Sequence, residues 1–87
     1  MSTKLSKREV EVLLFIAKEF TTSEIGTQLY ISKNTVETHR RNILNKLNVR
    51  NTAGMVRRGF ELGLLNVLEF KKSKKYAKVL IWAFFLI

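Results

Sequence analysis

The chain carries four helix-start signals in close succession, and each precedes apolar residues at helical spacing. The first two are Ser/Thr-x-x-Glu capping boxes, closed by Glu9 and Glu24, in which the hydroxyl and the carboxylate each accept a hydrogen bond from a backbone N–H. The other two are single N-cap residues. Signals this closely spaced leave room only for short helices joined by tight turns. The four N-cap residues are Ser6, Thr21, Ser32 and Asn51.

Apolar residues at three- and four-residue steps predict helices over residues 7–19, 22–29, 33–47 and 52–62. Asn48 and Gly63 follow the last two helices and are expected to end them, Asn48 in the left-handed conformation. Gly26 predicts that another backbone passes close by, as where two helices cross. The fold class is therefore all-α, a small four-helix domain. Its inward-facing residues are predicted to include Val10, Leu13, Leu14, Ala17, Val36, Ile43, Leu44 and Leu47.

The charge balance indicates the kind of partner. The 87 residues carry 16 Lys and Arg against 7 Asp and Glu, for a net charge of +9. This surplus favours a polyanion, either nucleic acid or an anionic membrane surface, and a merely solvated basic surface is the alternative. A domain of this size buries only about 60% of the surface that its unfolded chain exposes. We therefore expect no deep substrate cleft, and dimerisation would help to stabilise the fold.

Few residues are suited to catalysis or to metal binding. The chain has no Cys, which excludes disulfides and Cys-based zinc sites, and His39 is its only imidazole. Glu9 and Glu11 are two residues apart on a helix and do not face each other. We therefore expect no enzyme activity, no metal and no cofactor. The first residues lack the apolar run of a secretory signal, so a cytoplasmic location is expected.

Residues 22–41 read as two short helices joined by a tight turn, the second with a polar, basic outer face, which is the helix-turn-helix arrangement. An α-helix fits the major groove of DNA, where its outward side chains meet the base edges. Its first turn also offers free N–H groups to phosphate. On the residues alone, a solvated face is an equal alternative. Charge would come from Lys33, Arg40, Arg41 and Lys46, and hydrogen bonds from Asn34, Thr38 and Asn45.

Short motifs follow one another in a characteristic order across residues 5–65. They are Leu5-Ser6-x-Arg8-Glu9-x-Glu11-Val12-Leu13, Glu24-Ile25, Ile31-Ser32, Thr35-Val36-x-Thr38-His39, Leu47-x-Val49-Arg50-Asn51 and Glu61-Leu62-Gly63-Leu64. In this order and spacing they resemble the C-terminal DNA-binding domain of the LuxR/NarL (GerE) family. The resemblance implies a tetrahelical helix-turn-helix domain that binds double-stranded DNA and regulates transcription.

The resemblance also implies roles for individual residues. The third helix would enter the major groove, and the residues facing bases would be Glu37, Thr38 and Arg41. Residues near the phosphates would be Thr22, Ser23, Asn34, Thr35, His39, Lys46 and Arg50, and the basic face described above adds Lys33 and Arg40. The fourth helix would pair two copies across a two-fold axis, and the residues that share a face on it are Ala53, Val56 and Phe60.

Some positions depart from the usual pattern of this family. Glu37 stands where many relatives carry Lys, which lowers the attraction to the DNA backbone and favours a cytosine amino group. Gly59 stands where Ala is more usual, which weakens the helix expected to form the dimer. His39 either donates to a phosphate or packs as a hydrogen-bonded ring.

The composition changes after residue 65, and the domain is therefore predicted to span residues 1–65. The tail, residues 66–87, contains the basic run KKSKKYAK and then nine apolar residues, VLIWAFFLI. Nine residues are far fewer than the roughly 20 that a membrane-spanning helix needs. We expect the tail to pack on apolar surface of the domain or of a partner subunit. Contact with an anionic membrane surface, a disordered end and an artefact are the alternatives.

The leading hypothesis is sequence-specific binding of duplex DNA by a homodimer, with residues 33–47 as the recognition helix. Sigma factor region 4, which would bind RNA polymerase, shares the motif but not the flanking Leu5–Leu13 and Glu61–Leu64 patterns. The alternative of another class is an interaction protein that heterodimerises with a full-length relative and modulates it, with the tail as its contact to a membrane. Most members of the family carry a sensing domain before this one. We expect a natural single-domain form rather than a shortened piece.

Overall fold

The computed structural model describes residues 4–66, and within that range all regular structure is helical. The helices are α1 (Lys7–Ala17), α2 (Thr22–Leu29), α3 (Lys33–Leu47) and α4 (Thr52–Glu61). The four predicted helices and the all-α class are therefore confirmed. The predictions for residues 67–87, namely packing of the tail or membrane contact, lie outside the described residues.

Each helix begins at the predicted N-cap residue. At α1 the Ser6 hydroxyl accepts from the Glu9 backbone N–H at 3.1 Å, and the Glu9 carboxylate accepts from the Ser6 backbone N–H at 2.7 Å. Thr21 forms the same reciprocal pair of bonds with Glu24 at α2. The side chains of Ser32 and Asn51 accept from the backbone N–H three residues later, at 3.1 and 2.9 Å. The start signals therefore determine where the helices begin.

Each helix is followed by a residue in the left-handed conformation, and the next residue donates its N–H to a carbonyl five residues earlier. This is the Schellman arrangement, which satisfies carbonyl groups left without a partner at a helix end. Asn48 (φ 55°) and Gly63 (φ 72°) fill this position after α3 and α4, as predicted for Asn48. The closing bonds are Phe20 to Phe15, Ile31 to Gly26, Val49 to Leu44 and Leu64 to Gly59, at 2.9–3.1 Å.

The predicted end of the first helix at residue 19 is wrong by two residues. Glu19 adopts a left-handed φ of 66°, so the helix ends at Ala17. The rings of Phe15 and Phe20 lie 5.0 Å apart across this turn and supply the apolar contact that commonly accompanies such an ending. The sequence offers no Gly or Asn here to signal the turn. α4 likewise ends at Glu61, one residue before the predicted end.

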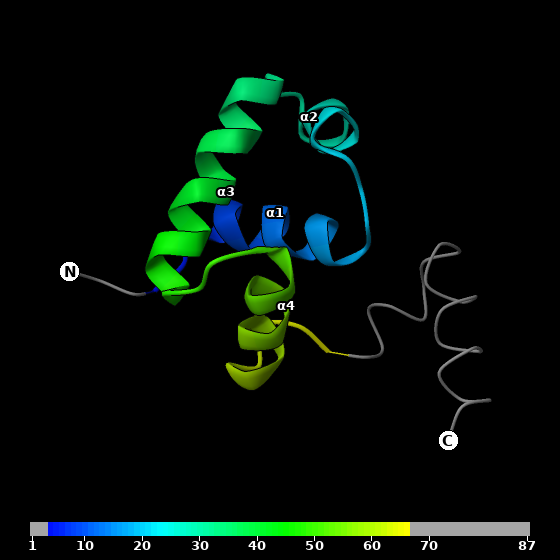
Figure 1. The fold of residues 1–87 in the computed structure, drawn as a ribbon. Helices are drawn as coiled ribbons and strands as arrows, with labels where there is room; N and C mark the ends of the chain where they lie inside the picture. The colour runs from blue at the N-terminus through cyan, green and yellow to red at the C-terminus, as the bar shows by residue number, and fades with distance from the viewer. Residues whose placement is uncertain (1–3, 67–87) are drawn as a thin grey trace.

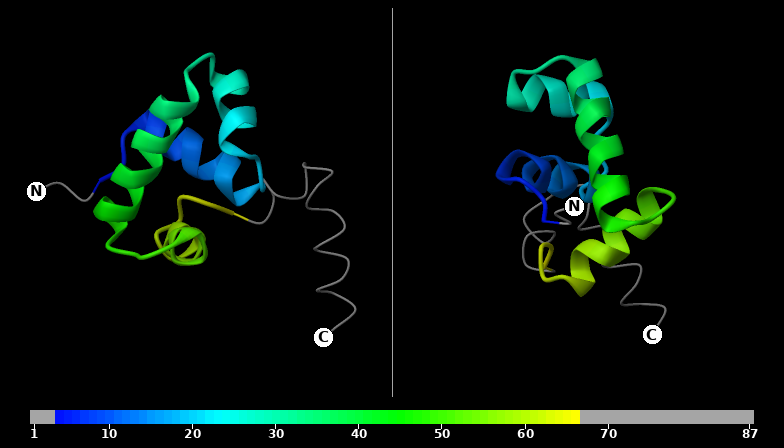
Figure 2. Two further views of the ribbon diagram at one scale, coloured as in Figure 1. Left: turned by 45° about the horizontal axis from the view of Figure 1, so that its top comes forward. Right: turned by 90° about the vertical axis from the view of Figure 1, so that its left-hand side faces the viewer.

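α1 and α3 form the centre of the fold, because each of them packs against all three other helices. Figure 1 shows α1 crossing the middle of the molecule, with α2 near one end of α3 and α4 near the other. In both views of Figure 2, α3 runs along one side of the molecule. One long side of α3 therefore remains outside the helical assembly. The core residues between the helices are Leu5, Val12, Leu13, Ala17, Ile25, Val36, Ile43, Leu47, Met55 and Leu65.

The core differs from the predicted one mainly at α1. Val12 is fully buried, whereas Val10 and Leu14 are only partly buried. The reason is that the buried residues Glu9, Val12, Leu13 and Ala17 form one helical stripe, and Val10 and Leu14 lie on the flank of that stripe. The close approach predicted at Gly26 is confirmed, although the neighbour is the turn after α2 rather than a crossing helix. A Cβ on Gly26 would lie 2.8 Å from the Ile31 carbonyl oxygen.

Candidate nucleic-acid interface

The outer side of α3 carries a continuous stripe of exposed polar side chains, which we call the polar stripe. It consists of Asn34, Thr38, Arg41 and Asn45. These residues recur at three- and four-residue steps directly opposite the buried Val36, Ile43 and Leu47. Because the core fixes the inner side of α3, it also fixes the direction in which the polar stripe faces.

Two of the three predicted base-facing residues lie in the polar stripe. Arg41 is exposed and takes part in none of the ion pairs found among residues 4–66. The Thr38 hydroxyl donates to the Asn34 carbonyl oxygen of the preceding turn at 3.1 Å, so its lone pairs remain available as acceptors. Together they present five guanidinium donors and a hydroxyl acceptor on one side of the helix.

The third predicted base-facing residue, Glu37, lies on the flank of α3 next to α2. Its carboxylate oxygen Oε1 accepts a hydrogen bond from the Thr22 hydroxyl at 2.8 Å, and both side chains are partly buried. Thr22 is the first residue of α2 and was predicted to contact phosphate. The structure thus joins a predicted base-facing residue to a predicted phosphate-contacting one.

Several predicted phosphate contacts gather at the beginnings of α2 and α3. Lys33, Asn34 and Thr35 occupy the first turn of α3 and are exposed, and Ser23 is exposed in the first turn of α2. Both helix starts carry partial positive charge and N–H groups that face outward. Arg50 is exposed in the turn between α3 and α4, and His39 is half-buried on α3.

Arg40 is directed toward α4 rather than outward. Its guanidinium donates to the hydroxyl of Thr52, the first residue of α4. Arg40, Thr52, Glu37 and Thr22 together line part of a groove of about 430 Å³ that continues over Phe20 and the end of α1. In this conformation Arg40 connects the recognition helix expected from the sequence to the start of α4.

Lys46 also has a partner within the domain. Its ammonium Nζ lies 2.7 Å from Oε1 of Glu9, whose side chain is only 5% exposed. Burial by itself raises the pKa of Glu9. The hydrogen bonds from Lys46 and from the Ser6 backbone, with the attraction of the Lys46 charge, outweigh burial and hold the pKa below its ordinary value of 4.5. This ion pair joins the first turn of α1 to the last turn of α3.

The three residues predicted for the dimer interface lie on the outer part of α4. Ala53 and Phe60 are exposed, and Val56 is partly buried against the core. Leu62, which follows directly, is 49% exposed. The inner side of α4 is formed instead by Met55 and Gly59. α4 therefore leaves apolar surface uncovered.

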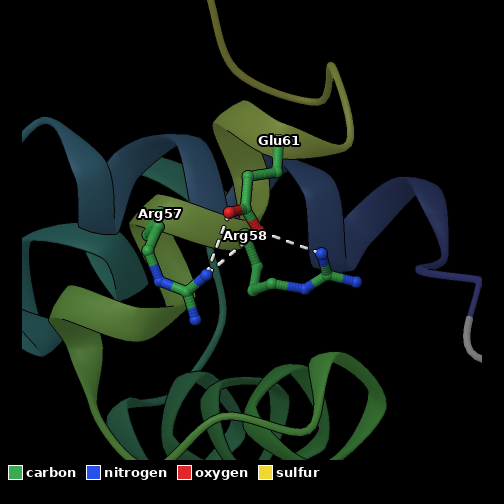
Figure 3. A network of polar contacts seen from close by, with 3 residues as sticks. All are labelled: Arg57, Arg58 and Glu61. Atoms are coloured by element: carbon green, nitrogen blue, oxygen red, sulfur yellow. Dashed lines mark hydrogen bonds and ion pairs between the residues drawn. The ribbon is translucent and has the colours of Figure 1, made fainter.

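Beside this surface, two arginines share one carboxylate. Arg57 and Arg58 both donate to Glu61, with closest N–O distances of 2.9 and 3.0 Å, and Figure 3 shows the two guanidinium groups on either side of that carboxylate. The hydrogen bond from Arg58 and the charges of both arginines lower the pKa of Glu61. Glu61 thus compensates one of the two positive charges of α4 within the helix.

Residues 4–66 show no grouping of three His, Cys, Asp or Glu side chains that could hold a metal ion. In the same residues, no helix combines the length and the apolar composition needed to cross a bilayer. Among residues 4–66, the buried charged side chain is that of Glu9, whose Oε1 accepts from the Ser6 backbone N–H and from Lys46 Nζ.

Residues 3–58 match the family model described as bacterial regulatory proteins, luxR family. The chain belongs to this family. The resemblance inferred from the motifs is thereby confirmed, and a family of regulatory proteins agrees with the expectation that the chain is not an enzyme. A solved structure described as transcription factor GerE has the same fold, with a TM-score of 0.69 and 32% identity. That match covers 76% of this chain and 97% of the GerE chain.

Two curated relatives are considerably longer than this chain. The oxygen regulatory protein NreC of Staphylococcus carnosus (strain TM300) is 40% identical over 62 residues, which are 71% of this chain and 29% of NreC. The transcriptional regulatory protein LiaR of Bacillus subtilis (strain 168) is 53% identical over 45 residues, 52% of this chain and 21% of LiaR. The chain thus spans less than a third of either relative.

Sequence reasoning did not identify the partners of the long polar side chains. Nothing in the motifs connects Glu9 with Lys46 or Arg40 with Thr52, because these residues are 37 and 12 positions apart. The only available signal was the Ser6-x-x-Glu9 box, which places a carboxylate at the start of α1. It does not indicate which helix would supply the cation.

Proposed function

We propose that this chain binds double-stranded DNA in a sequence-specific manner and regulates transcription in the bacterial cytoplasm, with α3 in the major groove. The observation that carries the proposal is the polar stripe of α3, whose four side chains are exposed on the side of the helix opposite the core. A major groove about 12 Å wide admits one helix whose outer side chains donate to and accept from the base edges. Membership in the luxR family of regulatory proteins supports the same function.

Within this proposal, Thr38 and Arg41 contact base edges. An arginine pairs with both acceptors of guanine, and a threonine presents a hydroxyl and a methyl group. Arg41 is suited to this role because no carboxylate among the described residues neutralises it. The predicted third base contact, Glu37, is also assigned to this surface, since its second carboxylate oxygen accepts no hydrogen bond from residues 4–66.

The exposed residues at the helix starts and turns contact the phosphates. They are Ser23, Lys33, Asn34, Thr35 and Arg50. His39 lies beside this set on α3 and is half-buried. We assign Lys46 and Arg40 a supporting part, because their cationic groups are bonded to Glu9 and Thr52 within the domain. Their charges still add to the positive field that attracts DNA.

We further propose that two copies associate through α4. The exposed Phe60 and Leu62 with Ala53 and Val56 provide apolar surface for a symmetric contact. A two-fold dimer would bring two α3 helices to two half-sites on one face of the duplex, so the bound sequence would be palindromic.

Selection of bound duplexes from a random pool, followed by titration of the best duplex at several salt concentrations, tests the proposal. We expect a palindromic consensus and a plot of log K against log[salt] with a slope of about −0.9 for each phosphate contact. Backbone amides of residues 32–47 should show the largest chemical-shift changes on titration. An affinity that depends neither on the duplex sequence nor on the salt concentration would contradict the proposal. A chain that binds no duplex but forms heterodimers with a full-length relative would favour the interaction-protein hypothesis.

A further inference from the structure

The hydrogen bond between Thr22 and Glu37 crosses from one helix of the helix-turn-helix to the other. It joins the first residue of α2 to the second turn of α3, 15 residues later, at 2.8 Å. Both side chains are partly buried in the groove between the helices, so water competes for the bond less than it would at a fully exposed site. A hydroxyl that donates to a carboxylate forms a charge-assisted bond, which is stronger than a neutral one.

This bond changes what Thr22 can do. A threonine hydroxyl has a single proton, and here that proton is directed to Glu37. The same hydroxyl therefore cannot donate to a DNA phosphate while the bond is intact. A phosphate brought beside it would also face the negative charge of Glu37. The Thr22 side chain is thus better suited to hold Glu37 than to contact the backbone of DNA.

The bond also limits the conformations of Glu37. A free glutamate side chain loses rotamer entropy when it is fixed at an interface, which weakens its contact by about two- to tenfold. Thr22 fixes Oε1 before DNA arrives, and the partial positive charge at the start of α2 supports the carboxylate there. Oε2 accepts no hydrogen bond from residues 4–66 and is therefore the oxygen available to another donor.

A carboxylate accepts hydrogen bonds but cannot donate them. In the major groove, amino donors are presented by cytosine at N4 and by adenine at N6, whereas guanine and thymine present oxygen acceptors that repel a carboxylate. Adenine places the N7 acceptor next to its amino group, which adds further repulsion. A fixed carboxylate on this flank of α3 therefore selects cytosine.

We propose that Thr22 is a positioning residue for base recognition: it holds the Glu37 carboxylate so that Oε2 accepts from the N4 amino group of one cytosine in each half-site. This inference rests on the proposed function, because it assumes that α3 lies in the major groove. It assigns the Thr22 side chain to sequence preference rather than to general affinity.

The test uses the full chain and the palindromic duplex selected above, with all four base pairs placed in turn at each half-site position. Glu37→Ala identifies the half-site position at which the preference for cytosine is lost. In wild type, this preference over the other bases should be about fivefold or more. Thr22→Val should reduce the preference at that same position by about two- to tenfold. Thr22→Ser, which restores the hydroxyl, should recover it. In the double variant T22V/E37A, removal of the hydroxyl should have no further effect there.

Thr27→Val is the matched control, because Thr27 is an exposed threonine of α2 whose hydroxyl donates to the Ser23 carbonyl oxygen and does not reach α3. It should leave the preference unchanged. Circular dichroism confirms that each variant is folded. If T22V weakens binding equally for all duplexes and leaves the cytosine preference intact, the hydroxyl is a phosphate contact and the inference is wrong. Failure of the wild-type chain to bind any duplex would instead overturn the proposed function, and the inference with it.

Discussion

α3 and α4 resemble each other on the inside and differ on the outside. Each buries apolar side chains against α1, among them Ile43 of α3 and Met55 of α4, which are both fully buried. On the outside, α3 exposes the polar stripe. On α4, Phe60 is 39% exposed, and Leu62, which follows the helix, is 49% exposed. A polar surface suits hydrated base edges and phosphates. An exposed apolar patch suits a protein surface.

The two helices also differ in how their positive charges are used. In α4, Glu61 binds both Arg57 and Arg58, as Figure 3 shows. In α3, Arg41 takes part in no ion pair found among the described residues. Under the proposed function, α3 would supply the attraction for DNA. The net charge of α4, +1 from Arg57, Arg58 and Glu61, would oppose the approach of a second copy only weakly.

The largest effects are expected from substitutions of buried residues on the inner sides of α3 and α4, which should lower stability to a similar extent. Ile43→Ala and Met55→Ala should each lower the free energy of unfolding by about 2–5 kcal/mol, because each leaves a cavity in the same core. Urea unfolding followed by circular dichroism measures both, with exposed Gln28→Ala as the control. A much smaller loss for Met55→Ala would mean that α4 is only loosely attached, and the comparison would fail.

The ion pair that holds the last turn of α3 comes next. Glu9→Gln should lower stability near neutral pH by about 1–3 kcal/mol, because Lys46 loses a charged hydrogen-bond acceptor. Since the folded pKa of Glu9 lies below the ordinary 4.5, its contribution is present above that value and is lost as the pH falls through the folded pKa. The difference between wild type and variant should therefore shrink in acid. A difference that is constant down to pH 2 would argue against this ion pair.

A base contact from the polar stripe should affect recognition without affecting the fold. Arg41→Ala should cost about 1–3 kcal/mol of discrimination at one base pair of each half-site. Its thermal midpoint and its self-association should match those of wild type, since Arg41 is exposed and unpaired in the described structure. Binding assays with single-base-pair variants measure the first effect, and melting and sedimentation the others. If Arg41→Ala weakened binding to every duplex equally, Arg41 would be a phosphate contact rather than a base contact.

Phe60→Asp should have the opposite effect to Arg41→Ala: it should weaken self-association and leave base discrimination unchanged. A charge on the apolar surface of α4 should weaken self-association by about 1–2 kcal/mol, the range expected for an aromatic interface residue. The base preferences read by one copy on an isolated half-site should remain those of wild type. Sedimentation equilibrium and half-site binding provide the two measurements. If Phe60→Asp leaves the dimer intact, the second copy does not use this surface.

The smallest effect is expected at Glu61. Although the pKa of Glu61 is lowered by Arg58 and Arg57, its side chain is exposed, so water and salt screen these pairs. Glu61→Gln should leave the thermal midpoint nearly unchanged at physiological salt and should increase the affinity for DNA slightly, because two arginines lose their anion. Melting and binding at two salt concentrations would check this. A large loss of stability would show that the network is structural.

The local parts of the fold were predictable because their signals span only a few residues. A cap such as Ser6 acts on the residue three positions later, and the Asn48 ending acts on the turn before it. Glu19 and Tyr30 occupy the same left-handed position after α1 and α2, but neither is a Gly or Asn. These endings depend on contacts such as the one between Phe15 and Phe20, so composition did not signal them.

The sequence by itself determined the number of helices, their starts and the outward direction of Asn34, Thr38 and Arg41, because capping and helical periodicity are short-range properties. Only the tertiary structure decided where the long polar side chains of the two flanks of α3 go: Lys46 to Glu9, Arg40 to Thr52 and Glu37 to Thr22. These pairs form when helices distant in the chain are packed together. The charge or hydrogen-bonding capacity of a residue does not reveal which partner the packing will place within reach.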